Sequence, residues 1–434
     1  MKNFPRSSPT QSTTSNSQLR RSDGDLDAYA VCAPGLEAIV ADELAGLGLT
    51  VTGSERGGVA LRTDLAGLYR ANLGARIATR ILQRLAAFRA RTFPDLASRT
   101  ADLPWEAYLA RGATVAVKAA SRASRLYILK RIAVTVAAAI ANRMGATPGE
   151  MPIPNALPLP PPGGRGKKPA PPRSTPPPPP GEGRGGGAHH GAAAPHPQQI
   201  LVRLVNNQCT ISLDTSGELL HRRGYRLATA KAPLRETLAC AVLALSGWQP
   251  DVPLLVPFCG AGTCAIEAAR WALGIPPGWD RLFAFQSWPT FDRAIWEALR
   301  DQAAAARRPT LPAPITASDR DPGAVRMAHA NAVRAGIGDL VTIEPRDFFD
   351  LRPDTPPGLV VINPPYGRRI APAGIRTFYR QIGTHLRAHF PAWRYAILCG
   401  SSSLARATGL AAGATHTLPH GGHPVTLITG TLNP

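Results

Sequence analysis

Acidic residues, paired cysteines and long apolar runs are all scarce in this 434-residue sequence. Asp and Glu total 29 against 49 Lys and Arg, so the chain carries a formal net charge of +20. Such an excess of positive charge favours a polyanionic partner, most simply nucleic acid. A coding bias towards Arg, Ala, Pro and Gly would give a similar composition, and composition alone does not separate these explanations.

The six cysteines form no C-x-x-C pair, so neither a zinc site nor a disulfide framework is indicated and no metal is expected. The longest apolar stretch, Ile132 to Ala141, is too short to span a bilayer. The N-terminal region lacks the apolar segment of a secretory signal, although its Ser, Thr and Arg content leaves an organellar transit peptide as an alternative. We therefore expect a cytoplasmic protein with no membrane partner.

The pattern of the sequence divides the chain into a tail and three folded units, the second of which carries an insertion. Residues 1–27 are polar and expected to be disordered, and residues 28–75 read as a small ferredoxin-like α+β unit. A second α+β unit covers 76–215, interrupted at 146–197 by a Pro/Gly-rich insertion that cannot bury a core. From 216 to 434 strands alternate with helices, which predicts an α/β domain with a mainly parallel sheet covered on both faces.

Within the second unit the pattern predicts strands at Ile77–Leu85 and Thr114–Ala119 and a helix that includes Trp105–Leu109. Asn206-Asn207 lies between two β-rich runs, which predicts a hairpin.

Four basic residues stand close together in the second unit. Arg122 and Arg125 lie in a predicted loop, and Lys130 and Arg131 lie at the start of a predicted helix that runs to about Met144. They are candidates for binding RNA phosphates, and a solvated helix face is the alternative.

The most informative motif is Asn363-Pro364-Pro365-Tyr366, which follows the apolar run Leu359–Ile362. Open α/β sheets bind ligands at the carboxyl ends of their strands. The Asn363 side-chain oxygen and the Pro364 carbonyl are hydrogen-bond acceptors that suit a planar exocyclic amine, and the prolines fix the backbone that carries them. Tyr366 offers a ring on which a base can stack. A proline-stiffened turn without a ligand is the simpler alternative.

A second turn has the features of a cofactor loop. A predicted strand, Pro253–Phe258, leads through Cys259–Thr263 into a predicted helix, Cys264–Leu273. Gly260 and Gly262 permit close backbone approach, and the free N–H groups at the start of the helix suit an anion such as the carboxylate of a methionyl group.

Two further strand ends carry acids. Asp319 follows the strand Ile315–Ser318 and is the candidate for ribose hydroxyls, because Asp321 is better placed to cap the next helix. Asp347 follows a third strand and is a candidate for an adenine amino group or a plain surface carboxylate. The long segment 275–314 between the glycines and Asp319 weakens a dinucleotide reading.

These residues together resemble the THUMP-domain class I methyltransferases, in particular the bacterial 23S rRNA guanine-N2 methyltransferases. The matching segments are Leu220–Arg226, Ala232–Ala239, Cys259–Thr263, Ile266–Ala269, Asp319–Asp321 and Asn363–Gly367. Residues 76–145 with 198–215 resemble a THUMP domain less specifically. The resemblance implies S-adenosylmethionine as cofactor, rRNA or alternatively tRNA as partner, and a Rossmann-like sheet whose last strand, here Val425–Thr431, is antiparallel.

The resemblance also distributes roles among the residues. Catalysis falls to Asn363, Pro364, Pro365 and Tyr366. Cofactor binding falls to Phe258, Cys259, Gly260, Ala261, Gly262, Thr263, Glu267, Asp319, Arg320, Asp347 and Asn363.

This sequence departs from the family pattern at two positions: Val256 stands where the family has an acid, and Ala261 where it has Ser. Because Thr263, Glu267 and Asp319 remain, an active enzyme is expected. A non-catalytic RNA-binding or assembly factor and a nicotinamide oxidoreductase are the other readings. Only the resemblance selects guanine N2, since the same clamp suits N6 of adenine or N4 of cytosine.

Overall fold

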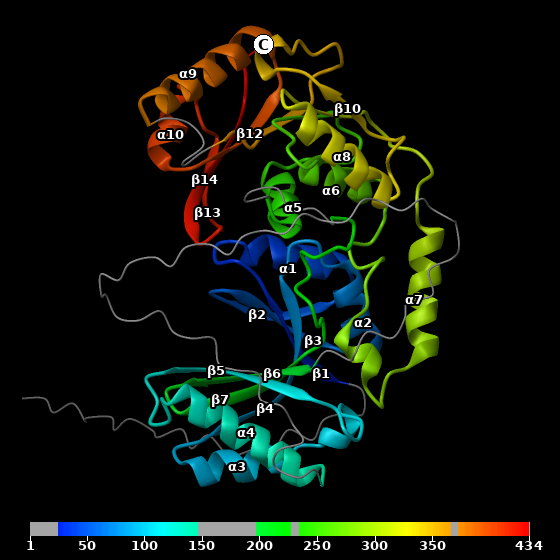
Figure 1. The fold of residues 1–434 in the computed structure, drawn as a ribbon, viewed down its shortest axis with the longest axis vertical. Helices are drawn as coiled ribbons and strands as arrows, with labels where there is room; N and C mark the ends of the chain where they lie inside the picture. The colour runs from blue at the N-terminus through cyan, green and yellow to red at the C-terminus, as the bar shows by residue number, and fades with distance from the viewer. Residues whose placement is uncertain (1–24, 146–196, 227–233, 366–371, 434) are drawn as a thin grey trace, which may run out of the picture.

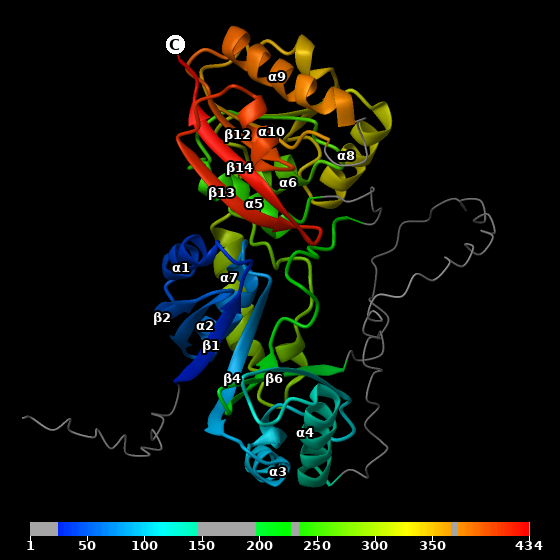
Figure 2. The same cartoon turned by 90° about the vertical axis from the view of Figure 1, so that its left-hand side faces the viewer.

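The computed structural model describes residues 25–145, 197–226, 234–365 and 372–433. These residues form two seven-stranded sheets, with strand orders β2-β3-β1-β4-β7-β6-β5 and β10-β9-β8-β11-β12-β14-β13. Figures 1 and 2 show the first sheet in the lower and middle parts of an elongated molecule and the second sheet at the upper end. Most of the expected tail and insertion lies outside the described residues.

The first sheet and its helices are built from the N-terminal part of the chain. The elements are β1 (Leu26–Val31), α1 (Glu37–Gly46), β2 (Thr50–Glu55), β3 (Gly58–Thr63), α2 (Leu65–Gly74), β4 (Arg80–Arg89), α3 (Phe93–Ala101), η1 (Trp105–Ala107), β5 (Val115–Arg122), α4 (Leu129–Arg143), β6 (Gln198–Val205) and β7 (Gln208–Asp214). Strand β4 pairs antiparallel with β1 on one side and with β7 on the other. The units expected at 28–75 and 76–215 therefore share one continuous sheet.

Three local expectations for this sheet need correction. Strand β1 begins at Leu26, inside the segment expected as tail. Strand β4 begins only at Arg80, because the Ile77 N–H is bound by the Glu43 carboxylate and not by a neighbouring strand. The helix expected at 105–109 is a single 3₁₀ turn, since the amides of Tyr108 and Leu109 both donate to the Trp105 carbonyl.

The hairpin expected at Asn206-Asn207 is confirmed. β6 and β7 are antiparallel and pair up to Val205 and Gln208, which leaves two residues in the turn. Asn206 and Asn207 have φ of 51° and 64°. Two left-handed residues give a turn whose twist matches that of the flanking strands, and Asn tolerates that conformation better than most residues.

The second sheet alternates with helices as expected. Its elements, with the helices around it, are α5 (Glu236–Leu245), β8 (Leu254–Pro257), α6 (Thr263–Ala272), η2 (Ala284–Ser287), α7 (Arg293–Ala305), β9 (Ile315–Asp319), α8 (Pro322–Arg334), β10 (Thr342–Pro345), η3 (Phe348–Asp350), β11 (Leu359–Ile362), α9 (Pro372–His389), β12 (Arg394–Cys399), α10 (Ser402–Ala407), β13 (Ala414–His420) and β14 (His423–Thr431). Strands β8 to β12 pair in parallel, and β14 pairs antiparallel with β12, which confirms the expected last strand.

Successive residues of the central strands face two different cores. In β11, Leu359 and Val361 pack into one cluster together with α5, α6 and α8, whereas Val360 and Ile362 pack into another with α9. This period of two places helices on both faces of the sheet and explains why the strand reads as a continuous apolar run. In the part of the chain that is described, no helix is both long and apolar enough to span a membrane.

One segment of the C-terminal part packs on the N-terminal sheet. Phe285 of η2 stacks on Tyr69 of α2 with ring centroids 4.3 Å apart, and Trp296 of α7 meets the same ring edge-on. Figure 1 shows α7 alongside α2. Residues 284–305 lie within the segment 216–434 that was expected as the methyltransferase domain, and burial of their aromatic rings places them against the N-terminal unit.

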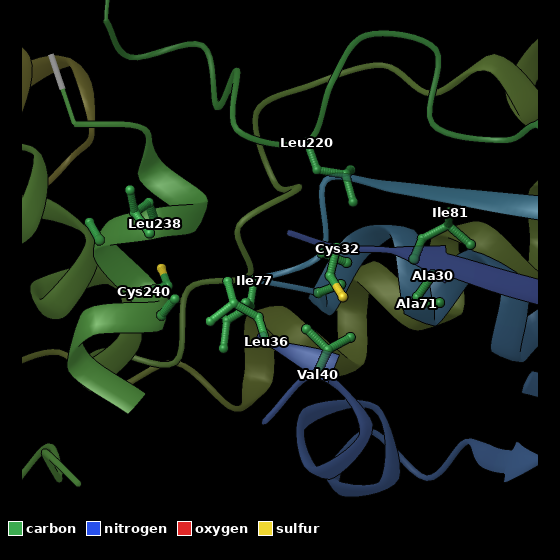
Figure 3. Close-up of a cluster of buried hydrophobic side chains, with 14 of the residues drawn as sticks. Ala30, Cys32, Leu36, Val40, Ala71, Ile77, Ile81, Leu220, Leu238 and Cys240 are labelled. Carbon is green, nitrogen blue, oxygen red and sulfur yellow. The ribbon is translucent and has the colours of Figure 1, made fainter. Parts of the chain in front are cut away.

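The two halves also share an apolar core. Figure 3 shows Ile77 lying between Leu36, near the start of α1, and the α5 side chains Leu238 and Cys240. All four side chains are buried. Removal of this surface from water fixes α5, and the helix α6 packed on it, against the N-terminal unit.

Two glycines of α9 allow a matched test of how α9 packs on α10. A methyl group at Gly383 would overlap the carbonyl oxygen of Thr408, whereas one at Gly374 would meet nothing within 4 Å in the described segments. We expect Gly383→Ala to lower the free energy of unfolding by about 1–3 kcal/mol. Gly374→Ala should raise it by about 0.5–1 kcal/mol through helix propensity. Urea unfolding of both variants measures this, and equal effects would contradict the packing of α9 on α10.

Candidate active site

Four strand ends converge on one edge of the second sheet. β8 lies between β9 and β11, and β10 lies beside β9, all in parallel. The residues at these strand ends are Phe258 directly after β8, Asp319 as the last residue of β9, Asp347 two residues after β10, and Asn363 directly after β11. The predicted cofactor and amine-binding residues therefore occupy neighbouring positions. This is the edge at which such sheets bind ligands.

The glycine loop has an unusual backbone. Phe258, Gly260 and Gly262 have φ of 58°, 54° and 81°. A Cβ at Gly262 would lie 3.0 Å from the Ala328 Cβ, whereas a Cβ at Gly260 would meet no atom of the described residues within 4 Å. Gly262 is thus required by helix packing, and Gly260 leaves open space above the loop for a ligand.

The start of α6 is free to bind an anion. Gly262 precedes α6 at the N-cap position, and no side chain caps this helix end. Unpaired N–H groups and the helix dipole favour negative charge at such an end. Thr263, the first residue of the helix, is buried beneath the loop.

Asp319 braces the glycine loop. Its two carboxylate oxygens accept hydrogen bonds from the backbone N–H groups of Gly260 and Asp321, each at 3.0 Å. Each oxygen keeps a further lone pair, and the side chain is partly exposed. The ribose role predicted for Asp319 is compatible with this geometry and stays a prediction.

The other acids at this edge also act on the backbone. Asp321 caps α8 through the Gly323 N–H at 2.8 Å, as the sequence predicted. Asp347 accepts from the Phe349 N–H at 2.9 Å and is partly exposed, so one of its oxygens is left for a ligand. Arg320 is exposed beside them.

Asn331 is a residue of the site that sequence reasoning missed. It is fully buried in α8, and its side-chain amide donates to the Ala261 carbonyl at 2.9 Å. Arg334, one turn later, donates to both the Asn331 oxygen and, at 2.8 Å, the Tyr225 carbonyl. An Asn nine residues into a predicted helix gives no local signal of this contact.

Glu267 was expected to contact the cofactor, and this prediction is wrong. Its side chain is 1% exposed, accepts from the Tyr225 hydroxyl at 2.9 Å and the Cys240 thiol at 3.2 Å, and lies 3.6 Å from the Arg223 guanidinium. Burial alone would raise the pKa of Glu267, but the cations Arg223 and Arg270 hold it below its usual range. Glu267 is a buried structural carboxylate beneath the site.

Asn363 carries an unused acceptor. Its side-chain oxygen is buried and has no hydrogen-bond partner among the described residues. An unpaired buried acceptor costs about 1–3 kcal/mol, so such atoms are rare unless a ligand completes them. Pro364 is buried behind it and Pro365 is partly exposed, whereas Tyr366 lies outside the described residues.

An aromatic cluster flanks the glycine loop. The Phe258 ring lies 5.3 Å from that of Phe348 and 6.0 Å from that of Phe378. The His385 ring lies 4.8 Å from Phe348. These rings come from three separate segments, the residue after β8, η3 and α9, so no local sequence pattern could predict that they meet.

The candidate RNA-binding residues lie elsewhere. Arg122, Arg125, Lys130 and Arg131 are all exposed, around the end of β5 and the start of α4. Figures 1 and 2 show α4 at the opposite end of the molecule from α9 and the second sheet. Among the described segments, no group of three or more His, Cys, Asp or Glu could hold a metal ion.

Protein-family models match both halves of this chain. Residues 223–427 match the "RMKL-like, methyltransferase domain" model and residues 27–82 the "RlmL ferredoxin-like domain" model. A Synechocystis protein assigned as an RNA methyltransferase is 32% identical over 92% of this chain and 95% of its own. The ribosomal RNA large subunit methyltransferase K/L of Methylococcus capsulatus is 35% identical over 91% of this chain, which spans 50% of that longer protein.

A solved structure agrees in fold. SMU.472, assigned as a methyltransferase and crystallised with S-adenosylhomocysteine, is 28% identical with a TM-score of 0.78, covering 95% of this chain and 99% of its own. The fold is that of a methyltransferase that uses S-adenosylmethionine. The chain belongs to the RMKL-like methyltransferase family.

Asp319→Asn tests the brace on the glycine loop. The variant replaces one accepting oxygen with an amino group, so one backbone N–H loses its partner and the loop loosens. We expect S-adenosylmethionine to bind about tenfold or more weakly, as measured by isothermal titration calorimetry. Asp321→Asn is the control, because Asn caps a helix as well as Asp does. Equal affinities of the two variants would refute the bracing role.

His385 makes stability depend on pH. Burial, with help from His389 and Arg352, lowers the pKa of His385 to about 4. In the unfolded chain this histidine titrates near 6.5, so between these values only the unfolded state binds the proton and stability falls as pH falls. Between pH 6.5 and 4 the wild type should lose about 2–3 kcal/mol of its free energy of unfolding through this histidine. We expect His385→Gln to abolish that part of the loss. Urea unfolding at a series of pH values measures this, and parallel curves would contradict it.

Proposed function

We propose that this protein transfers the methyl group of S-adenosylmethionine to the exocyclic N2 of a guanosine in RNA, with 23S rRNA as the first candidate substrate. The observation that carries the proposal is the buried side-chain oxygen of Asn363, at the strand end beside the glycine loop, which has no hydrogen-bond partner among the described residues. RNA as the substrate class is supported by the net charge of +20 and by relatives named for RNA methylation.

The residues present fit the cofactor. The uncapped start of α6, at Thr263, suits the methionyl carboxylate, and the space above Gly260 admits the ligand. The free lone pairs of Asp319 suit the ribose hydroxyls, and Asp347 can accept from the adenine amino group. S-adenosylmethionine, when bound, supplies a methyl group on a positively charged sulfur.

Asn363 and Pro364 then orient the nucleophile. The guanosine is unstacked and turned into the site, as is required of enzymes that modify base atoms. The Asn363 side-chain oxygen and the Pro364 carbonyl accept the two N–H groups of N2, which directs the nitrogen lone pair towards the methyl carbon. Tyr366, which lies outside the described residues, is proposed to stack on the base.

Transfer requires positioning more than acid–base chemistry. The N–C bond forms as the C–S bond breaks, its electron pair stays on sulfur, and a proton leaves the methylated nitrogen to water. No dedicated base is needed, because N2 becomes acidic once it bears the methyl group. Holding the reacting atoms about 3 Å apart and in line provides most of the acceleration.

The same clamp would suit other amines. N6 of adenine, N4 of cytosine and N2 of a tRNA guanosine present the same two N–H groups.

A non-catalytic RNA-binding factor is the alternative from another class, because Val256 stands where the family has an acid. Calorimetry separates that factor, since it predicts no binding of S-adenosylmethionine. Membership of the RMKL-like methyltransferases removes the nicotinamide oxidoreductase reading.

Asn363→Ala tests the clamp directly. We expect at least a hundredfold loss of methyl transfer to rRNA from a strain that lacks the gene, because the variant has no oxygen to orient the amine. Binding of RNA should change less than threefold. Asn142→Ala, an exposed position on α4, is the control and should retain full activity. Unchanged methyl incorporation by Asn363→Ala would refute the clamp.

The modified base is identified separately. Mass spectrometry of nucleosides from the methylated rRNA should show N2-methylguanosine, lost in the deletion strain and restored with the gene. Methylation of adenine N6 or cytosine N4 instead would overturn the guanine assignment while leaving the enzyme class intact.

A further inference from the structure

An exposed apolar tip lies between β5 and α4. Tyr127, Ile128 and Leu129 are 73%, 47% and 46% exposed, although each is large and apolar. Contiguous exposed apolar side chains of this kind mark a candidate interaction site. Nothing in the strand-end chemistry uses them.

The tip is held rigidly. The Asn207 side chain accepts from the Arg125 N–H at 2.7 Å, and the Asn207 N–H donates to the Ser124 hydroxyl at 2.9 Å. The Ser121 hydroxyl donates to the carbonyl of the buried Leu126 at 2.6 Å. A ring presented on a preorganised loop binds with little loss of conformational entropy.

Positive charge surrounds the tip. Four of the cations are the candidate RNA-binding residues Arg122, Arg125, Lys130 and Arg131. The end of β4 adds Arg89 and Arg91, because the Ala90 N–H between them donates to the carbonyl of Asn207 at 2.9 Å. All six cations are exposed. None of them forms an ion pair with an acid of the described chain; Arg131 instead lies 4.0 Å over the Phe93 ring.

The combination selects one kind of partner. Unpaired nucleotides expose both a base face for an aromatic ring and a phosphate for each cation, whereas a duplex hides its base faces. A protein partner would match the apolar tip but would leave six cations without counter-charge unless it were strongly acidic.

We propose that Tyr127, with the six surrounding cations, is a docking site for an unpaired segment of the substrate RNA. The proposal rests on the proposed RNA methyltransferase function and deepens it. Because this end of the molecule lies opposite the second sheet (Figures 1 and 2), the substrate must carry two features: a target nucleotide and a separate single-stranded anchor.

Fluorescence anisotropy on the full chain tests the anchor. The probes are a labelled ten-nucleotide single-stranded RNA and a blunt ten-base-pair RNA hairpin closed by a non-nucleotide linker, which contains no unpaired base. We expect Tyr127→Ala to weaken single-strand binding about tenfold and hairpin binding less than twofold, and Tyr127→Phe to bind as the wild type does. Leu282→Ala, an apolar residue 77% exposed elsewhere, is the matched control and should change neither affinity.

The charges have a separate signature. Replacing both Arg89 and Arg91 by Ala should weaken both probes and lower the slope of log affinity against log salt by about 1–2. An unchanged slope would remove these two arginines from the site.

Other outcomes overturn the docking site without touching the chemistry. Equal single-strand affinities of wild type and Tyr127→Ala, or a tighter hairpin than single strand, would refute it. So would a monomer–dimer change on Tyr127→Ala in sedimentation with no change in RNA affinity, since the tip would then bind a second copy. Tyr127-dependent binding by a wild type that transfers no methyl group would support the docking site and overturn the proposed function.

Discussion

The contact between Arg223 and Glu267 is the one on which the site depends. Both side chains are 1% exposed, and the Arg223 guanidinium also donates to the Arg76 carbonyl at 2.6 Å and the Leu220 carbonyl at 2.7 Å. It therefore joins the N-terminal unit to α6, the helix that begins directly after the glycine loop. Removing one partner of such a buried pair leaves an uncompensated charge and costs about 3–5 kcal/mol.

This buried contact explains why a methyltransferase sheet and an N-terminal module form one body here. Arg76 continues the connection through the Ile275 carbonyl at 3.0 Å, and the next segment of chain covers the N-terminal sheet with Phe285 and Trp296 before it returns as β9. The long segment between the glycines and Asp319 thus packs against the N-terminal half and connects the two halves. Movement of either half against the other would disturb the start of α6.

Much of the fold could be predicted because its signals are local. The strand ends at Asp319 and Asn363, the cap at Asp321 and the Asn206-Asn207 turn each follow from a few adjacent residues. Glu267 was misassigned because its partners come from residues 223, 225 and 240, and helical position alone does not show which neighbours a carboxylate meets. The Phe258 cluster and the approach of Arg89 to Arg125 were missed for the same reason: pairing of distant strands creates them.

Val256 bears on whether the site is degenerate. It is 4% exposed and pairs with Ala317 across the sheet, so it is part of the core beneath the loop. An acid at position 256 would either be buried away from water or extend to the ligand. The glycine loop does not need such an acid as a support. That support comes from Asp319 below Gly260 and from Asn331 below Ala261. Both supports remain, and in the part of the chain that the structure describes the Asn363 oxygen lacks a partner. The loss of the acid therefore changes affinity for the cofactor more readily than it abolishes the geometry of transfer.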